Sequence, residues 1–289
     1  MDAVESLGYR CDAKNLELNS YENRVYQIGI ADSDPIIAKF YRPGRWSLSQ
    51  INEEHRFTLE AKRNGLSVVA PLIIKEKTCF EYHGFNIAIF PRRGGRAPEL
   101  DNLECLETLG RFIGRLHTVG ASDSFKYRSR ISVEEYGVSS RDWLLENDIL
   151  PEDIRTSYST VTKPLLKLIQ QKFDLASPDL LRLHADCHMG NVLWREGQPH
   201  FVDFDDARTG PAIQDLWMLL SGNEESQSIQ INRILKGYED FKDFNTSELM
   251  LIEPLRALRL MHHAAWLAHR WNDPAFPRAF PFFNTQRYW

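Results

Sequence analysis

Short apolar and β-branched runs, separated by polar turns, fill the first ninety residues of the chain. Val, Ile, Phe and Tyr recur in these runs, which is typical of antiparallel β-strands. The runs that predict strands cover residues 16–19, 24–30, 35–41, 71–75, 78–82 and 85–90. We expect these runs to form a five-stranded antiparallel sheet, which has one strand fewer than the six runs.

One helix is predicted among the strands, and helices are predicted for most of the chain beyond residue 100. Ser47 can cap a helix and Gln50 can complete a capping box, while Gly65 stops the helix after Asn64. Beyond residue 100, apolar positions recur three and four residues apart, which indicates amphipathic helices. We expect these helices at residues 102–121, 152–173, 227–241 and 246–271, with an irregular polar stretch at 122–138. The chain should therefore be of the α+β class.

The segment from His184 to Asp206 has the clearest chemical pattern. Asp186 and Asn191 lie five residues apart in a polar stretch, and the apolar run 192–194 follows them. A turn then leads into a second apolar run that ends at Asp203. A β-hairpin made by these two runs would bring Asp203 back beside Asn191.

Phosphoryl transfer from a nucleotide needs this set of side chains. An aspartate orients the acceptor hydroxyl and takes its proton, while an asparagine and a second aspartate hold the magnesium ion on the phosphates. Magnesium prefers hard oxygen ligands and keeps several waters, so one amide and one or two carboxylates suffice. We therefore assign Asp186 as the base, and Asn191 and Asp203 as ligands of Mg²⁺.

A zinc site is a competing interpretation of the same segment. His184, Cys187 and His188 are residue types that bind zinc, but this assignment leaves Asn191 and Asp203 without a role. We expect His184 to be a packed, hydrogen-bonded support of the loop. We expect Cys187 to be a packed thiol, since a redox switch would need a lowered pKa that sequence does not show.

The bulk composition excludes several classes of partner. A formal net charge of −5 and a pI near 6.0 give no general attraction to nucleic acid or to an anionic membrane. The four cysteines are scattered without a C-x-x-C pair, which is typical of free thiols in a reducing cytoplasm. The first ten residues lack the basic and apolar regions of a signal peptide. We expect a cytoplasmic monomer that does not bind membranes.

The motif H-x-D-x-x-x-x-N, followed by an apolar strand that ends in Asp, resembles the aminoglycoside and choline phosphotransferases of the protein-kinase-like superfamily. Three further segments resemble the bacterial stress response kinase A family, which consists of Ser/Thr protein kinases. They are residues 18–27 (LNSYENRVYQ), 39–43 (KFYRP) and 210–217 (GPAIQDLW). The similarity extends over essentially the whole chain.

This resemblance implies a bilobal kinase-like fold that uses ATP and Mg²⁺. Residues 1–91 would form an N-terminal nucleotide-binding lobe, made of the five-stranded sheet and one helix. Residues 92–289 would form a mainly helical lobe for catalysis and acceptor binding. In that superfamily the C-terminal helices wall the acceptor site, so the helices expected at residues 227–241 and 246–271 should lie there.

The resemblance also implies roles for charged residues outside the hairpin. Lys39 would hold the α- and β-phosphates, as in the apolar-Ala-Lys motif of kinases; a solvent-facing residue of an edge strand is the alternative. Glu54, rather than Glu53, would fix Lys39. Asp205 would bind a second magnesium ion, with a solvated carboxylate as the alternative. Asp215 would brace the catalytic loop.

The nucleotide itself would be held by two further segments. Ser20 would be the polar residue nearest the phosphates, in a loop that lacks the G-x-G-x-x-G motif of protein kinases; a plain hairpin turn is the alternative. Adenine would bind the backbone of the hinge between the lobes, at Ile89, Phe90 and Pro91.

The acceptor implied by the resemblance is a Ser or Thr hydroxyl of a protein, in a bacterial stress response. The first alternative is a kinase of small-molecule hydroxyls, of the aminoglycoside, choline or homoserine type. A nucleotide-binding regulator without turnover and a zinc hydrolase are the other two alternatives.

Overall fold

The structure is a computed structural model that describes residues 1–18 and 20–289. The described chain divides into two compact units. The first unit comprises Met1–Ser129, Leu181–Thr209 and Asp215–Phe244, and the second comprises Arg130–Leu180, Gly210–Gln214 and Asn245–Trp289. The lobe boundary after residue 91 stays a prediction, and the expected strand end at Asn19 lies outside the described residues.

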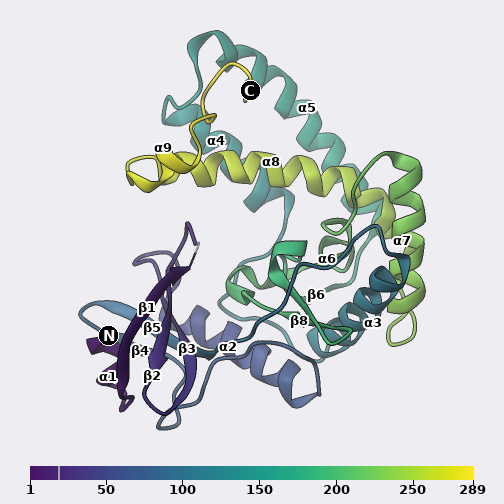
Figure 1. The fold of residues 1–289 in the computed structure, drawn as a ribbon. Helices are drawn as coiled ribbons and strands as arrows, with labels where there is room; N and C mark the ends of the chain where they lie inside the picture. The colour runs from purple at the N-terminus through teal and green to yellow at the C-terminus, as the bar shows by residue number, and fades with distance from the viewer. Residues whose placement is uncertain (19) are drawn as a thin grey trace. The chain divides into compact units, whose positions relative to one another are not determined.

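The first unit contains the expected five-stranded antiparallel sheet, in the order β1-β2-β3-β5-β4 (Figure 1). Its strands are β1 (Cys11–Leu18), β2 (Arg24–Ile30), β3 (Ser33–Phe40), β4 (Phe80–Tyr82) and β5 (Phe85–Pro91). The expected strand at 71–75 is wrong. That segment makes single hydrogen bonds in place of a strand ladder: the Leu72 N–H donates to the carbonyl of Ile89 at 2.7 Å, and Ile74 forms an isolated bridge with Lys77.

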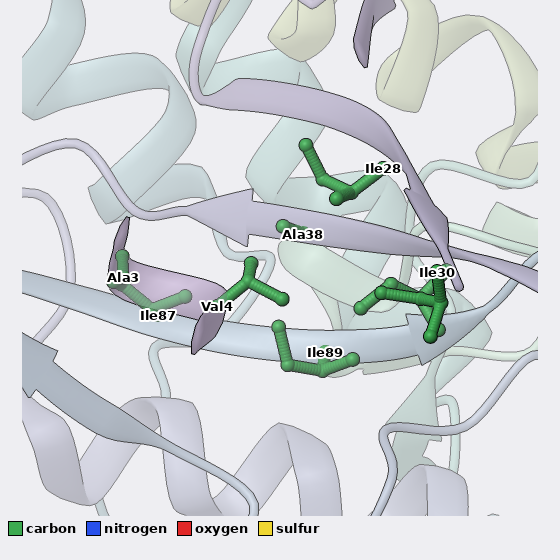
Figure 2. Packing of buried hydrophobic residues seen from close by; sticks show 8 residues of the cluster. Ala3, Val4, Ile28, Ile30, Ala38, Ile87 and Ile89 are labelled. Carbon is green, nitrogen blue, oxygen red and sulfur yellow. The ribbon is translucent and has the colours of Figure 1, made fainter. Parts of the chain in front are cut away.

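Alternation along β3 sends its side chains to opposite faces of the sheet. Ala38 packs in an apolar cluster with Val4 of the short helix α1 (Asp2–Glu5) and with Ile87 and Ile89 of β5 (Figure 2). The next apolar cluster, on the other face, joins Tyr41 to helix α2 (Leu48–Arg63). Lys39, one residue after Ala38, is thereby turned away from the α1 cluster.

The remaining helices of the first unit pack closely. Ser47 caps α2 and Gln50 completes the capping box, as expected. Helix α3 (Leu103–Gly120) lies against α7 (Glu224–Tyr238). A Cβ atom on Gly110 would lie 2.0 Å from the carbonyl oxygen of Ile234, so this helix contact requires glycine.

Two small sheets and short turns carry the segment from His184 to Asp206. The sheets are formed by β6 (Leu180–Leu183) with β9 (Arg208–Pro211), and by β7 (Val192–Arg195) with β8 (Gln198–Phe201). The turns between these strands are the 3₁₀ segments Met189–Asn191 and Phe204–Asp206, and the short helix α6 (Ile213–Trp217) follows β9.

The second unit is helical. It contains a π-helix (Val133–Val138), α4 (Ser139–Glu146), α5 (Glu152–Ala176), a 3₁₀ segment (Thr246–Leu251), α8 (Ile252–His269) and α9 (Ala275–Ala279). The irregular stretch expected at 122–138 therefore ends in a π-helix, and the helix expected at 246–271 begins as a 3₁₀ segment. No helix in the described part of the chain is long and apolar enough to cross a membrane.

Candidate active site

The buried carboxylate of Asp215 binds the backbone of the loop that carries Asp186. Asp215 Oδ2 accepts a hydrogen bond from the His184 N–H at 2.9 Å, and Oδ1 accepts one from the Ala185 N–H at 2.7 Å. His117 Nε2 lies 3.1 Å from Oδ2. Ala185 has φ +69°, a left-handed conformation that costs an L-residue about 1–2 kcal/mol. Asp215 therefore holds the loop in a shape that the chain would otherwise avoid, which is the brace that the resemblance implied.

His184 joins the Asp186 loop to the strand that leads to Asp203. Its Nε2–H donates to the carbonyl of Val202 at 2.8 Å, and its Nδ1 accepts from the backbone N–H of Asp186 at 3.3 Å. The ring is fully buried. The expectation that His184 supports the loop is confirmed.

The β7–β8 hairpin brings Asn191 and Asp203 to the same end of the two strands. Val192 pairs with Phe201, and the Val202 N–H donates to the carbonyl of Asn191 at 3.0 Å. The hairpin predicted from the sequence is confirmed. Asp203 itself has φ +55° and begins the 3₁₀ segment that follows the hairpin.

The side chain of Asn191 is oriented by Asp186. Its Nδ2 donates to the Asp186 carbonyl at 2.9 Å and lies 3.3 Å from the Asp186 Oδ2. His188 also contacts this carboxylate, with Nε2 3.4 Å from Oδ2. Because the amide nitrogen is engaged, Oδ1 is the atom that Asn191 offers to a cation.

Lys39 lies between two carboxylates. Its Nζ is 2.9 Å from Asp203 Oδ1 and 3.1 Å from Asp205 Oδ1. Burial works against the charged form of Lys39, yet Asp203, Asp205 and Glu54 together raise its pKa above the usual value. The lysine is therefore charged at neutral pH.

Asp203 and Asp205 differ sharply in exposure, with 51% of the first side chain accessible and 4% of the second. The alternative of Asp205 as a solvated carboxylate is thus wrong. Burial disfavours its charged form, but Lys39 and Arg45 outweigh that effect and lower the pKa of Asp205 to about 2.

The two neighbouring glutamates of α2 have separate tasks. Glu53 accepts hydrogen bonds from the backbone N–H groups of three consecutive residues, at 2.6, 2.9 and 2.9 Å; these are Lys126, Tyr127 and Arg128. Glu54 is buried near Lys39. Among the described residues, Lys39 forms its ion pairs with Asp203 and Asp205, and its nitrogen lies more than 4.0 Å from the carboxylate oxygens of Glu54. The Glu54 carboxylate instead meets the hydroxyl of Tyr41 at 3.4 Å. Burial raises the pKa of Glu54 to about 7, although Lys39 and Arg128 lower it in part.

The loop between β1 and β2 is held by side chains instead of by glycines. Ser20 Oγ accepts from the Asn23 N–H at 3.2 Å. The Asn23 side chain is buried, accepts from the Arg42 N–H at 3.2 Å and donates to Asp205 Oδ2 at 3.1 Å. The Arg42 side chain binds the carbonyl of Glu22 at 3.1 Å. The phosphate contact expected of Ser20 stays a prediction.

The three residues expected to bind adenine lie at the end of β5, paired with β3. Ile89 is fully buried in the α1 cluster, and its carbonyl already accepts from the Leu72 N–H. Phe90 packs against the apolar cluster that joins Tyr41 to α2, and Pro91 has no N–H to donate. Adenine binding by Ile89, Phe90 and Pro91 stays a prediction.

The geometry argues against the zinc interpretation. His184 is bound to Val202, and Cys187 is fully buried. Burial, followed by the charges of Asp215 and Asp186, raises the pKa of the Cys187 thiol well above its usual value. Across residues 1–18 and 20–289, no group of three or more His, Cys, Asp or Glu side chains is arranged to hold a metal ion.

Sequence reasoning missed the arginines around Asp205. Arg45 Nη1 lies 2.5 Å from Asp205 Oδ2, and Arg128 Nη1 donates to the Asp205 carbonyl at 2.6 Å. Both guanidinium groups lie over the ring of Trp46, at 5.3 and 4.3 Å from its centroid. In sequence they look like ordinary surface arginines, and no local signal separates them from such residues.

The donor set fits a nucleotide with a magnesium ion. Asp203 is a half-exposed carboxylate, and Asn191 offers an amide oxygen at the same end of the hairpin. Both are hard ligands of the kind that Mg²⁺ prefers. Lys39 adds a charged ammonium group beside them, suited to phosphate oxygens.

Comparison with known proteins gives consistent results. The profile of the phosphotransferase enzyme family matches residues 15–252. "Stress response kinase A" of Salmonella typhi is 46% identical over 291 residues, covering 100% of this chain and 88% of that protein. "Serine/threonine protein kinase RdoA" of Salmonella typhimurium (strain LT2) is 45% identical with the same coverage.

Solved structures of low sequence identity share the fold. An amicoumacin kinase in complex with AMP-PNP, Ca²⁺ and Ami superimposes with a TM-score of 0.77 at 21% identity, over 98% of this chain and 91% of that one. A microcompartment-associated aminopropanol kinase gives 0.69 at 16% identity, over 98% and 93%. The fold is therefore that of the kinase-like phosphotransferases. The chain is a kinase-type phosphotransferase and belongs to the phosphotransferase enzyme family, among the stress response kinase A proteins.

Proposed function

We propose that the protein transfers the γ-phosphoryl group of ATP to a Ser or Thr hydroxyl of another protein, in a bacterial stress response. One observation carries the proposal: the hairpin places Asn191 and Asp203 together, with the charged Lys39 at 2.9 Å from Asp203. The relatives at 43–46% identity that are named stress response kinase or Ser/Thr protein kinase support a protein acceptor.

In this proposal Asp186 is the base. Its carboxylate accepts the proton of the acceptor hydroxyl while the new O–P bond forms and the bond to the departing ADP breaks. Asn191 and Asp203 would hold Mg²⁺, which neutralises charge that develops on the phosphates. Lys39 would bind phosphate oxygens. His184 and Asp215 keep the base in place, through the backbone bonds described above.

Transfer from [γ-³²P]ATP tests the assignment of the acceptor. Purified protein should label Ser or Thr of protein substrates such as casein, and a parallel panel of amino alcohols and aminoglycosides should stay unlabelled. Asp186→Asn should lower transfer by about 10²–10⁴-fold, because general-base catalysis contributes that much. Its affinity for ATP should change little. Asp240→Asn, which removes a half-exposed carboxylate that pairs with Arg111, is the matched control and should behave as the unmodified protein.

A small-molecule acceptor is the second candidate function. The observation in its favour is that the solved structures of the same fold include an aminopropanol kinase and a spectinomycin phosphotransferase. Label found only on a small alcohol would establish this candidate and refute the protein acceptor. Nucleotide binding without transfer to anything would favour a regulator.

A further inference from the structure

Asp205 lies two residues after Asp203; its Oδ2 has two close donors, whereas its Oδ1 faces the ammonium group of Lys39 without a hydrogen bond. Lys39 Nζ is 3.1 Å from Oδ1, while Arg45 Nη1 and Asn23 Nδ2 are 2.5 and 3.1 Å from Oδ2. A carboxylate that binds magnesium must present a free lone pair to it. A magnesium ion at Asp205 would compete with Lys39, Arg45 and Asn23 at a side chain that is 4% accessible, whereas Asp203, which Lys39 also contacts, leaves 51% of its side chain accessible.

Arg45 extends this contact to two other segments. Its Nη2 lies 2.7 Å from Asp206 Oδ1, and its Nε lies 3.7 Å from Glu22 Oε1 in the loop before β2. The planar, forked guanidinium group thus reaches the carboxylates of both Asp205 and Asp206. Arg45 therefore connects the segment after β3 with the segment after β8.

Asn23 makes the third connection. It donates to Asp205 and accepts from the backbone of Arg42, so it links the loop of residues 20–23 with the metal-binding segment. This loop lacks the glycine-rich motif, and these side-chain bonds fix its position. Lys39, Arg45 and Asn23 thus meet at one buried carboxylate.

We propose that Asp205 is a positioning residue and not a ligand of a second magnesium ion. With Arg45 and Asn23 it fixes Lys39 and the loop of residues 20–23 relative to Asp203. This inference rests on the proposed ATP site, because it assigns the loop and Lys39 to the nucleotide. It replaces the interpretation of Asp205 as a metal ligand.

The test measures the binding of a fluorescent ATP analogue, carrying an N-methylanthraniloyl group, over a series of Mg²⁺ concentrations. Asp205→Asn should weaken binding at saturating Mg²⁺ by about ten-fold, which corresponds to about 1.4 kcal/mol. The Mg²⁺ concentration that gives half of the maximal binding should change by less than about three-fold, that is by less than about 0.7 kcal/mol. If that concentration instead rises as much as in Asp203→Asn, and excess Mg²⁺ restores binding, Asp205 is a ligand and the inference is wrong.

Second variants keep the test decisive if Asp205→Asn does not fold. Asn23→Ala removes only the loop contact, and it should weaken nucleotide binding without altering the Mg²⁺ dependence. Arg45→Met should do the same, and Arg45→Lys should recover part of the affinity because it keeps the charge. Where both fold, Asn23→Ala should add little to Asp205→Asn in a double mutant, because the two share one contact. Unchanged affinity in Asn23→Ala and Arg45→Met would overturn the inference.

Two reference variants separate this inference from the proposed function. Asp203→Asn should abolish the Mg²⁺-dependent part of nucleotide binding. If it does not, the proposed function fails, whatever Asp205→Asn shows. Asp240→Asn removes an ion-paired carboxylate elsewhere and should bind nucleotide as the unmodified protein does. Circular dichroism melting curves confirm that each variant is folded.

Discussion

Replacement of Asp215 by Asn should destabilise the protein strongly. The carboxylate is fully buried and accepts hydrogen bonds from His184 N–H, Ala185 N–H and His117 Nε2. Asn keeps one oxygen but turns the other into an N–H₂ group, so at least one of the three donors then faces another donor. An unsatisfied buried donor costs about 1–3 kcal/mol, and the bonds that remain lose their charged acceptor.

The size of the effect follows from these contacts together. One unsatisfied donor costs about 1–3 kcal/mol and each of the two remaining bonds loses about 1 kcal/mol with the charge, so we expect Asp215→Asn to cost about 3–5 kcal/mol. The left-handed Ala185 adds to the effect, because its N–H bond to Asp215 is what compensates the unfavourable φ of +69°. Asp186 follows directly, so phosphoryl transfer should fall as well.

Urea unfolding, followed by circular dichroism, measures the loss in the free energy of unfolding. Asp240→Asn is the control, since its pair with Arg111 is about half exposed and worth about 0–1 kcal/mol. A loss below about 1 kcal/mol in Asp215→Asn would show that the loop does not depend on this carboxylate.

Three further changes test other parts of the structure. Glu54→Gln should remove a pH dependence of the free energy of unfolding. Burial raises the pKa of Glu54 from 4.5 to about 7, so between these pH values the carboxyl group is protonated only in the folded state. The unmodified protein should then lose about 3 kcal/mol relative to the variant as the pH rises through that window, as measured by urea unfolding at constant ionic strength. Gly110→Ala would place a Cβ 2.0 Å from the Ile234 carbonyl oxygen and should lower the free energy of unfolding by about 1–3 kcal/mol. Gly94→Ala is the control and should be neutral, because its Cβ would meet only a side chain at 3.6 Å. Equal melting temperatures of the two variants would contradict the close α3–α7 contact. Ser47→Ala should cost about 1 kcal/mol of unfolding free energy through the lost cap, and no change in thermal melting would show that Ser47 is dispensable.

Elements whose pattern depends on burial were predictable from the sequence. Helix α3 was expected at 102–121 and spans Leu103–Gly120, because its apolar residues recur on one buried face. Helix α2 was found through its capping residues. The β7–β8 hairpin was recognised because two apolar runs flank a turn.

Elements without such a pattern were missed. Strand β1 begins at Cys11, five residues before the expected start, because it is an edge strand whose side chains are mostly exposed. Its register shifts between Cys11 and Asn15, which breaks the alternation. The π-helix Val133–Val138 has a wider turn than the 3.6-residue period used to recognise helices. Helix α4 was not anticipated.

The candidate site was predictable where it lies within one hairpin. Asn191 and Asp203 are twelve residues apart, and a turn explains their proximity. Contacts between distant segments were not predictable in the same way. Arg45 and Asp205 are 160 residues apart, and a charged pair of that separation leaves no trace in local spacing. Glu53 likewise looks the same as Glu54 in sequence, although it binds three backbone amides.

Cys187 offers a chemical reporter of the motion of the loop that carries Asp186. Its thiol is buried beside Asp186, and burial keeps it protonated, whereas alkylating reagents and peroxides react with exposed thiolates. Modification of this cysteine by iodoacetamide can therefore proceed only as fast as the loop opens. The rate of labelling of the Cys187 peptide, measured by mass spectrometry, therefore reports the opening of this loop in the native protein.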